Sequence, residues 1–140
     1  MRPGMSSSTS VFGAIATLLM LAPWVASSEV PTPEAYQLHC SGCHGADGRG
    51  IEASTPPLTD LADLLGLPGG REYLARVPGV AQAPLESAAL AKLLNWTLRE
   101  FSSPRDFRPY VEAEIDVFRK RPLRDPLAAR PTAAARSKTD

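Results

Sequence analysis

Both cysteines and both histidines of the 140-residue chain fall within one short stretch, from His39 to His44. This stretch contains the pattern Cys40-Ser-Gly-Cys43-His44, with two thiols about one helical turn apart and an imidazole directly after the second. The pattern is typical of covalent haem attachment, in which each thiol adds to a porphyrin vinyl group and the imidazole binds the iron. We therefore expect one covalent haem c on Cys40 and Cys43, with His44 as the proximal iron ligand.

Two other uses of a Cys-x-x-Cys pair fit the sequence less well. A thioredoxin-like redox motif belongs to a βαβ unit, whereas residues 33–40 read as a short helix and the chain after residue 28 lacks strand-like alternation. A structural zinc site needs four ligands, and the chain has no second Cys/His pair to complete one. Haem attachment remains the interpretation that uses all of these residues.

Residues 1–28 resemble a secretory signal peptide. Arg2 precedes a polar run, an apolar stretch from Val11 to Ala26, and small residues that suit cleavage after Ser28. The alternative is that this segment is kept as an uncleaved anchor, although the apolar stretch is short for a full membrane span. With either interpretation we expect the folded body outside the cytoplasm, in the periplasm.

The region from Pro33 to Phe101 resembles a class I cytochrome c, a monohaem electron carrier of the bacterial periplasm. The resemblance rests on five features: a helix that runs into the Cys-x-x-Cys-His motif, the Gly-Ala-Asp-Gly-Arg-Gly segment after it, Thr55-Pro-Pro-Leu58, the Val77-Pro-Gly79 turn, and a final long helix. It implies an all-α fold built around the haem. It also implies that a proline carbonyl accepts a hydrogen bond from the proximal imidazole; Pro56 is the matching residue, and Pro57 is the alternative.

The chain departs from this family at the sixth iron ligand. The family ligand is a methionine just after the Pro-Gly turn, but the last methionine here is Met20. Gln82 stands near that position, so we expect either a weak bond from its amide oxygen or an open or water-filled site with high-spin or mixed-spin iron. His39 is expected on the proximal side, at the surface or near the propionates, and Lys92 is expected in solvent.

Apolar periodicity predicts the helices that position these residues. They cover residues 33–40, 59–66, 69–77, 86–101 and 111–121. The 86–101 helix should pack its apolar face on Ala35, Tyr36 and Leu38 of the first helix and on the haem edge, with Trp96 as a core residue.

The helix at 111–121 is an addition to the family pattern. Its apolar positions, Val111, Ile115 and Phe118, should dock it on the cytochrome body. We therefore expect a signal peptide at 1–28, a cytochrome c domain at 29–103, a C-terminal helical extension at 104–122 and a disordered tail at 123–140.

Charge is unevenly distributed along the chain. Residues 29–118 hold 13 acidic and 7 basic side chains, a balance of −6, whereas residues 119–140 hold 7 basic and 2 acidic ones, a balance of +5. We interpret these charges as solubilising, with steering of a partner as the alternative. Membrane contact is expected only through an uncleaved N-terminus or this basic tail. Nucleic-acid binding is not expected, because the protein is exported and no basic stripe is interleaved with aromatic residues.

The predicted function is one-electron transfer between periplasmic redox proteins, such as a dehydrogenase or an oxidase, without enzymatic activity. The alternative is a haem protein that binds O2, NO or CO at an open sixth position; Tyr110 or Phe118 would then shape the ligand pocket if the extension covers the distal face. A peroxidase is the weakest interpretation, because residues 80–84 offer no histidine or arginine to cleave a peroxide bond.

Overall fold

The computed structural model describes Met1 and residues 32–104 and 107–132; the rest of the predicted signal peptide lies outside these residues. The described part contains α-helices and one π-helix but no β-strand, so the fold class is all-α, as predicted. In chain order the elements are α1 (Thr32–His39), α2 (Ser41–His44), α3 (Leu61–Leu65), α4 (Gly70–Arg76), α5 (Pro78–Ala81), α6 (Ser87–Thr97), the π-helix η1 (Leu98–Ser102) and α7 (Glu112–Phe118). No helix in the described residues is long and apolar enough to cross a membrane.

The predicted helices are present, but their ends differ, most clearly in three places. The expected Val77–Gly79 turn contains the start of α5, because Pro78 stands in the first helical turn, where the missing N–H leaves no bond unmade. The expected helix at 86–101 divides into α6 and the π-helix η1. The extension helix α7 ends at Phe118 rather than at Arg121.

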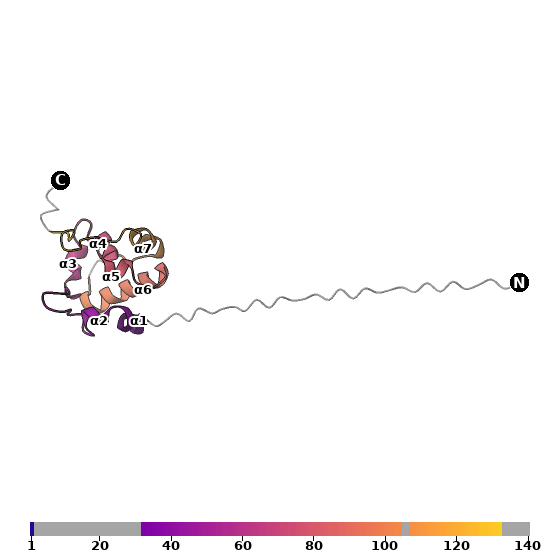
Figure 1. The fold of residues 1–140 in the computed structure, drawn as a ribbon, viewed down its shortest axis with the longest axis horizontal. Coiled ribbons are helices and arrows are strands. Elements are labelled where there is room, and N and C mark those ends of the chain that lie inside the picture. Colours follow the sequence, from indigo (N-terminus) through magenta and orange to yellow (C-terminus); the bar gives the residue numbers. More distant parts are fainter. Residues whose placement is uncertain (2–31, 105–106, 133–140) are drawn as a thin grey trace.

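Helix α6 lies at the centre of the fold and packs on α1, α7 and η1 (Figure 1). Its Leu93 packs with the buried Ala35 and Tyr36 of α1, as expected. The predicted contact of Leu38 is wrong, since this side chain is 69% exposed. Leu38 lies about 200° around the helix from Tyr36, so the two side chains cannot face α6 together.

An aromatic cluster joins α1 to the end of α6. The Tyr36 ring centroid lies 5.5 Å from that of Trp96 and 4.9 Å from that of Phe101. The hydroxyl of Tyr36 donates to the Gly45 carbonyl at 2.7 Å, which ties this cluster to the residue after His44. Trp96 is half-buried and packs against the cluster of Ala35, Tyr36 and Leu93, in agreement with its interpretation as a core residue.

The extension docks on the body, as its apolar face predicted. Ile115 is fully buried in the main core, and Phe118 packs against that core half-buried. Val111, however, is 55% exposed, because it precedes α7 in an extended conformation and so does not share the face of the helical positions.

The chain beyond α7 also packs on the body. The Leu123 N–H donates to the Arg76 carbonyl at 2.9 Å, and the Tyr73 hydroxyl donates to the Pro126 carbonyl at 3.0 Å. Leu123 and Pro126 therefore contact α4, whereas the sequence predicted a disordered tail from residue 123. Residues 133–140 lie outside the described part.

Candidate functional site

The two cysteines lie where α1 passes into the one-turn helix α2. The Cys40 N–H donates to the Tyr36 carbonyl at 2.9 Å and the His44 N–H donates to the Cys40 carbonyl at 3.0 Å, so the motif is wound as helix. Neither thiol is in a disulfide; Cys40 is half-buried and Cys43 is exposed. Burial, followed by the neighbouring Cys43, raises the pKa of the Cys40 thiol. Among the described residues, no group of three or more His, Cys, Asp or Glu side chains is placed to hold a metal ion.

The His44 imidazole is oriented by a main-chain carbonyl. Its Nδ1 lies 3.2 Å from the Pro56 oxygen. Because a carbonyl oxygen only accepts, Nδ1 carries the proton and the Nε2 lone pair is left for a metal. Burial lowers the pKa of His44, against the opposing effect of the Pro56 bond, which favours the neutral, metal-binding form. Of the two prolines considered, Pro56 makes this bond.

Two glycines give the chain the conformation that brings Pro56 back to His44. The Gly50 N–H donates to the His44 carbonyl at 2.8 Å, and the Leu58 N–H donates to the Gly48 carbonyl at 2.7 Å. Gly48 and Gly50 have φ of +71° and +73°, a region that side chains disfavour. A Cβ on Gly48 would lie 2.7 Å from the Phe101 ring, and one on Gly50 would lie 2.9 Å from the Pro56 oxygen.

A largely apolar cavity of about 470 Å³ opens beside the motif. This volume lies within the range of about 300–1,000 Å³ that small-molecule and cofactor sites occupy. Cys40, Cys43 and His44 line it together with side chains of α3, α4 and α6. The Thr97 hydroxyl is buried on this wall and has no hydrogen-bond partner in the described structure, as expected where a bound group completes the wall. The residues therefore fit a porphyrin attached through the two thiols.

Gln82 is not brought into this cavity. Its side chain is exposed and lines a separate small groove that it shares with His39, Pro78 and Gly79. The neighbouring Ala81 and Ala83 are buried, so the chain turns the intervening residue outward. The structure thus does not support Gln82 as a ligand of the iron.

His39 is half-buried and lines both the groove and the cavity. It therefore lies between the attachment end of the cavity and the distal loop, residues 77–85, rather than simply on the proximal side. Lys92 is exposed on α6, as expected.

An arginine of the extension holds the distal loop in place. The Arg119 guanidinium donates to the carbonyls of Ala81, Ala83 and Leu85 at 3.2, 2.7 and 2.5 Å. This role could not be predicted from the sequence, because Arg119 begins a basic run that resembles ordinary surface charge.

The extension also lines the cavity itself. Tyr110 is 3% exposed and forms part of the wall, with its hydroxyl donating to the Arg71 carbonyl at 2.7 Å. Burial is the largest influence on the pKa of Tyr110 and raises it strongly, so the phenol stays protonated. Phe118, the other residue expected at the pocket, is not part of the wall. Pro126, Leu127 and Arg130 line the cavity too, and sequence reasoning missed all three.

Comparison with known families matches residues 32–93 to the Cytochrome c family. No curated protein matches the chain. The match begins with α1 and ends within α6, so it includes the attachment motif, Pro56 and the distal loop but not the extension. Proteins of this family carry covalently attached haem c, the group that the free thiols, the oriented imidazole and the cavity fit. Residues 32–93 are therefore a cytochrome c domain, whose cofactor is a covalently attached haem c.

Proposed function

We propose that this protein is a periplasmic one-electron carrier that passes electrons between redox proteins and catalyses no reaction of its own. The observation that carries the proposal is the His44 imidazole, held by Pro56 with Nε2 left for iron, beside Cys40 and Cys43. When bound, the haem supplies reversible one-electron chemistry at its iron. The chain fixes the cofactor, orients its proximal ligand and surrounds it with apolar side chains.

The attachment end of the cavity is the side through which we propose that electrons enter and leave. Cys43 is exposed there, and His39 is half-buried at the same end. A porphyrin bonded to Cys43 would therefore present an edge near the surface, within reach of a docked partner. We propose a dehydrogenase or an oxidase of the periplasm as that partner, and the signal-like residues 1–28 support this location.

A second function, reversible binding of O2, NO or CO, is favoured by the distal loop. The loop residues that line the cavity are Val77, Gly79, Val80 and Ala83. None of their side chains can bind iron, and the exposed Gln82 lies in the neighbouring groove. In this conformation the loop leaves the distal side of the iron to a small ligand.

Optical spectra of the oxidised, reduced and CO-treated reduced holoprotein would separate the two functions. A sharp low-spin reduced spectrum that CO does not change would support electron transfer with a firm sixth ligand. A broad high-spin spectrum that shifts at once with CO would support ligand binding. The mass of protein purified from the periplasm tests the location, since cleavage after Ser28 leaves Glu29 as the first residue.

A further inference from the structure

The turn at residues 125–130 forms a wall of the haem cavity although it lies outside the matched family segment. Pro126, Leu127 and Arg130 line the cavity. The Tyr73 hydroxyl holds the Pro126 carbonyl, and the Ala128 N–H donates to Asp125 Oδ1 at 3.0 Å within the turn. The turn is thus fixed both to α4 and internally.

Arg130 is the only side chain of fixed positive charge among the described residues that line this cavity. The other titratable side chains of the wall are the two cysteines, two histidines and two tyrosines, and no Asp or Glu is among them. Asp125 is nearby in sequence, but its carboxylate accepts the Ala128 N–H and is not part of the wall. An anionic group in this cavity therefore has one permanent counter-charge within the described structure.

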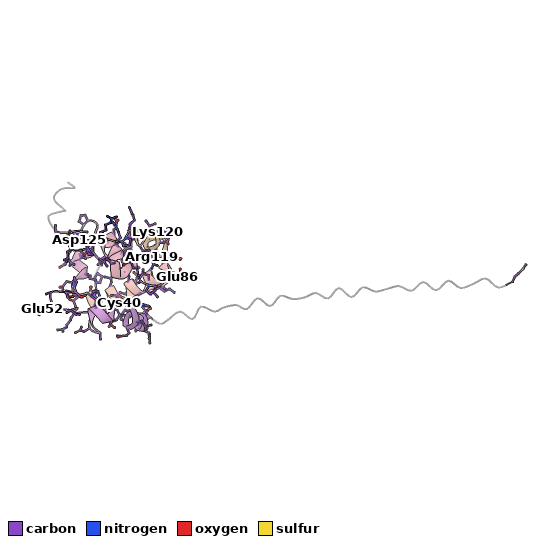
Figure 2. The ribbon with its side chains drawn as sticks, viewed as in Figure 1. Cys40, Glu52, Glu86, Arg119, Lys120 and Asp125 are labelled. Atoms are coloured by element: carbon purple, nitrogen blue, oxygen red, sulfur yellow. The ribbon has the colours of Figure 1, made fainter. Side chains whose placement is uncertain are left out.

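The covalent bonds define which way the porphyrin points. Its two vinyl groups lie on one edge, where Cys40 and Cys43 would bind them, and its two propionates lie on the opposite edge. Figure 2 shows Cys40 in the lower half of the folded body and Asp125 in the upper half. The propionate edge would accordingly point toward the end where the 125–130 turn closes the cavity.

We propose that the Arg130 guanidinium pairs with a haem propionate, so that the turn at residues 125–130 completes the cofactor site. A guanidinium suits this partner because its planar N–H groups can donate two parallel bonds to a carboxylate. Leu127, which is 81% exposed in the protein alone, would cover the porphyrin edge beside it. The proposal rests on covalent haem attachment and is independent of whether the protein carries electrons or binds ligands.

The test compares Arg130→Gln, Arg130→Lys and Arg124→Gln as holoproteins, by haem content and by reduction potential between pH 5 and 9. Arg124 is an exposed arginine six residues earlier that does not line the cavity, so it is the matched control. A cation near the propionates favours the reduced haem, which carries one positive charge less, and favours ionised propionates. Arg130→Gln should therefore attach a full complement of haem, lower the potential, and shift the pH-dependent step of the potential to higher pH.

The charge-conserving Arg130→Lys variant should stay close to the parent protein, and Arg124→Gln should match the parent. The difference between Arg130→Gln and the parent should shrink as salt is added, because screening weakens a solvent-accessible pair. The proposal is overturned if the potential and pH profile of Arg130→Gln coincide with those of Arg124→Gln. Loss of haem from Arg130→Gln would also overturn it, because that would give Arg130 a structural role in folding or attachment.

Discussion

The attachment segment at residues 40–58 and the C-terminal part of the chain at residues 107–132, which includes the extension, line the same cavity but are held in different ways. Main-chain hydrogen bonds hold the attachment segment, with Gly48 and Gly50 in conformations that other residues disfavour. Side-chain contacts between residues far apart in the sequence hold the extension, among them those of Arg71 with Glu114 and of Arg119 with the Ala83 carbonyl. The contrast shows that residues close together in the sequence form the attachment site. Closure of the cavity instead depends on ion pairs and side-chain hydrogen bonds between residues far apart in the sequence.

The extension is anchored most firmly at Arg71 of α4. Arg71 donates through Nε and Nη2 to the two carboxylate oxygens of Glu114, each at 2.6 Å. The same guanidinium lies 3.9 Å from the centroid of the Tyr110 ring. Asn95 of α6 adds a reciprocal pair, donating to the Tyr110 carbonyl at 2.9 Å and accepting from its N–H at 2.7 Å. Tyr110 is thereby placed in the cavity wall by groups that lie outside the extension.

The largest effect is expected from removing the attachment chemistry. The double variant Cys40→Ala/Cys43→Ala should carry no covalent haem, because no other thiols exist in the chain. Haem staining of the denatured protein, with the single variants as controls, measures this directly. A double variant that still carries haem after denaturation would contradict the assignment of both thiols.

A core substitution in the extension should destabilise the protein without removing the haem. Ile115→Ala empties a fully buried position of α7 and should lower the free energy of unfolding by about 2–5 kcal/mol. Val111→Ala, at a 55% exposed position next to the same helix, should change it by less than about 0.5 kcal/mol. Thermal unfolding of the two holoproteins provides the measurement. Equal effects would mean that α7 does not dock as described.

A glycine in the attachment segment tests the other side of the comparison. Gly50→Ala forces a side chain into a left-handed conformation, at a cost of about 1–2 kcal/mol, and crowds the Pro56 carbonyl. We expect lower stability together with a changed haem spectrum, since the carbonyl orients His44. Gly42→Ala is a suitable control, because a Cβ there meets nothing within 4 Å and its φ is not in the left-handed range. If both variants keep the parent spectrum, Gly50 does not position Pro56.

A pH-dependent effect is expected at Glu114. The hydrogen bonds from Arg71 are the main influence on the pKa of Glu114 and lower it, against burial, which raises it. This pair therefore stabilises the fold above the unperturbed glutamate pKa of about 4.3, and its contribution is lost as the pH falls through the lowered pKa. Glu114→Gln should lose about 1–3 kcal/mol at pH 7 and approach the parent protein in acid.

Chemical denaturation at pH 7 and at pH 3 measures the two differences for Glu114→Gln. The exposed Asp116, which pairs with Lys120 four residues away, provides the control Asp116→Asn. This variant should show little change at either pH, because exposed pairs contribute little. A loss for Glu114→Gln that is as large at pH 3 as at pH 7 would assign it to packing rather than to charge.

The sequence predicted those parts of the site that neighbouring residues determine. The roles of Cys40, Cys43 and His44 can be predicted because haem attachment needs these residue types at a fixed spacing. The role of Pro56 follows from the resemblance to the family. The role of Arg119 could not be predicted, because the carbonyls that it binds are distant in the sequence. The role of Arg130 could not be predicted either, because its proposed partner belongs to the cofactor. The exposed position of Gln82 could not be predicted, because the sequence alone does not show which way the residue after α5 points.

The aromatic cluster gives the protein a built-in optical signal. The chain has two tryptophans, and one of them, Trp24, belongs to the predicted signal peptide. After cleavage Trp96 would be the sole indole, packed against the same cluster of Ala35, Tyr36 and Leu93 as Cys40, which would bond the haem. Its emission would be quenched by energy transfer to the attached porphyrin and would brighten in any molecule that lacks one. The tryptophan fluorescence of the purified protein would then measure the fraction of molecules without haem, and no added label would be needed.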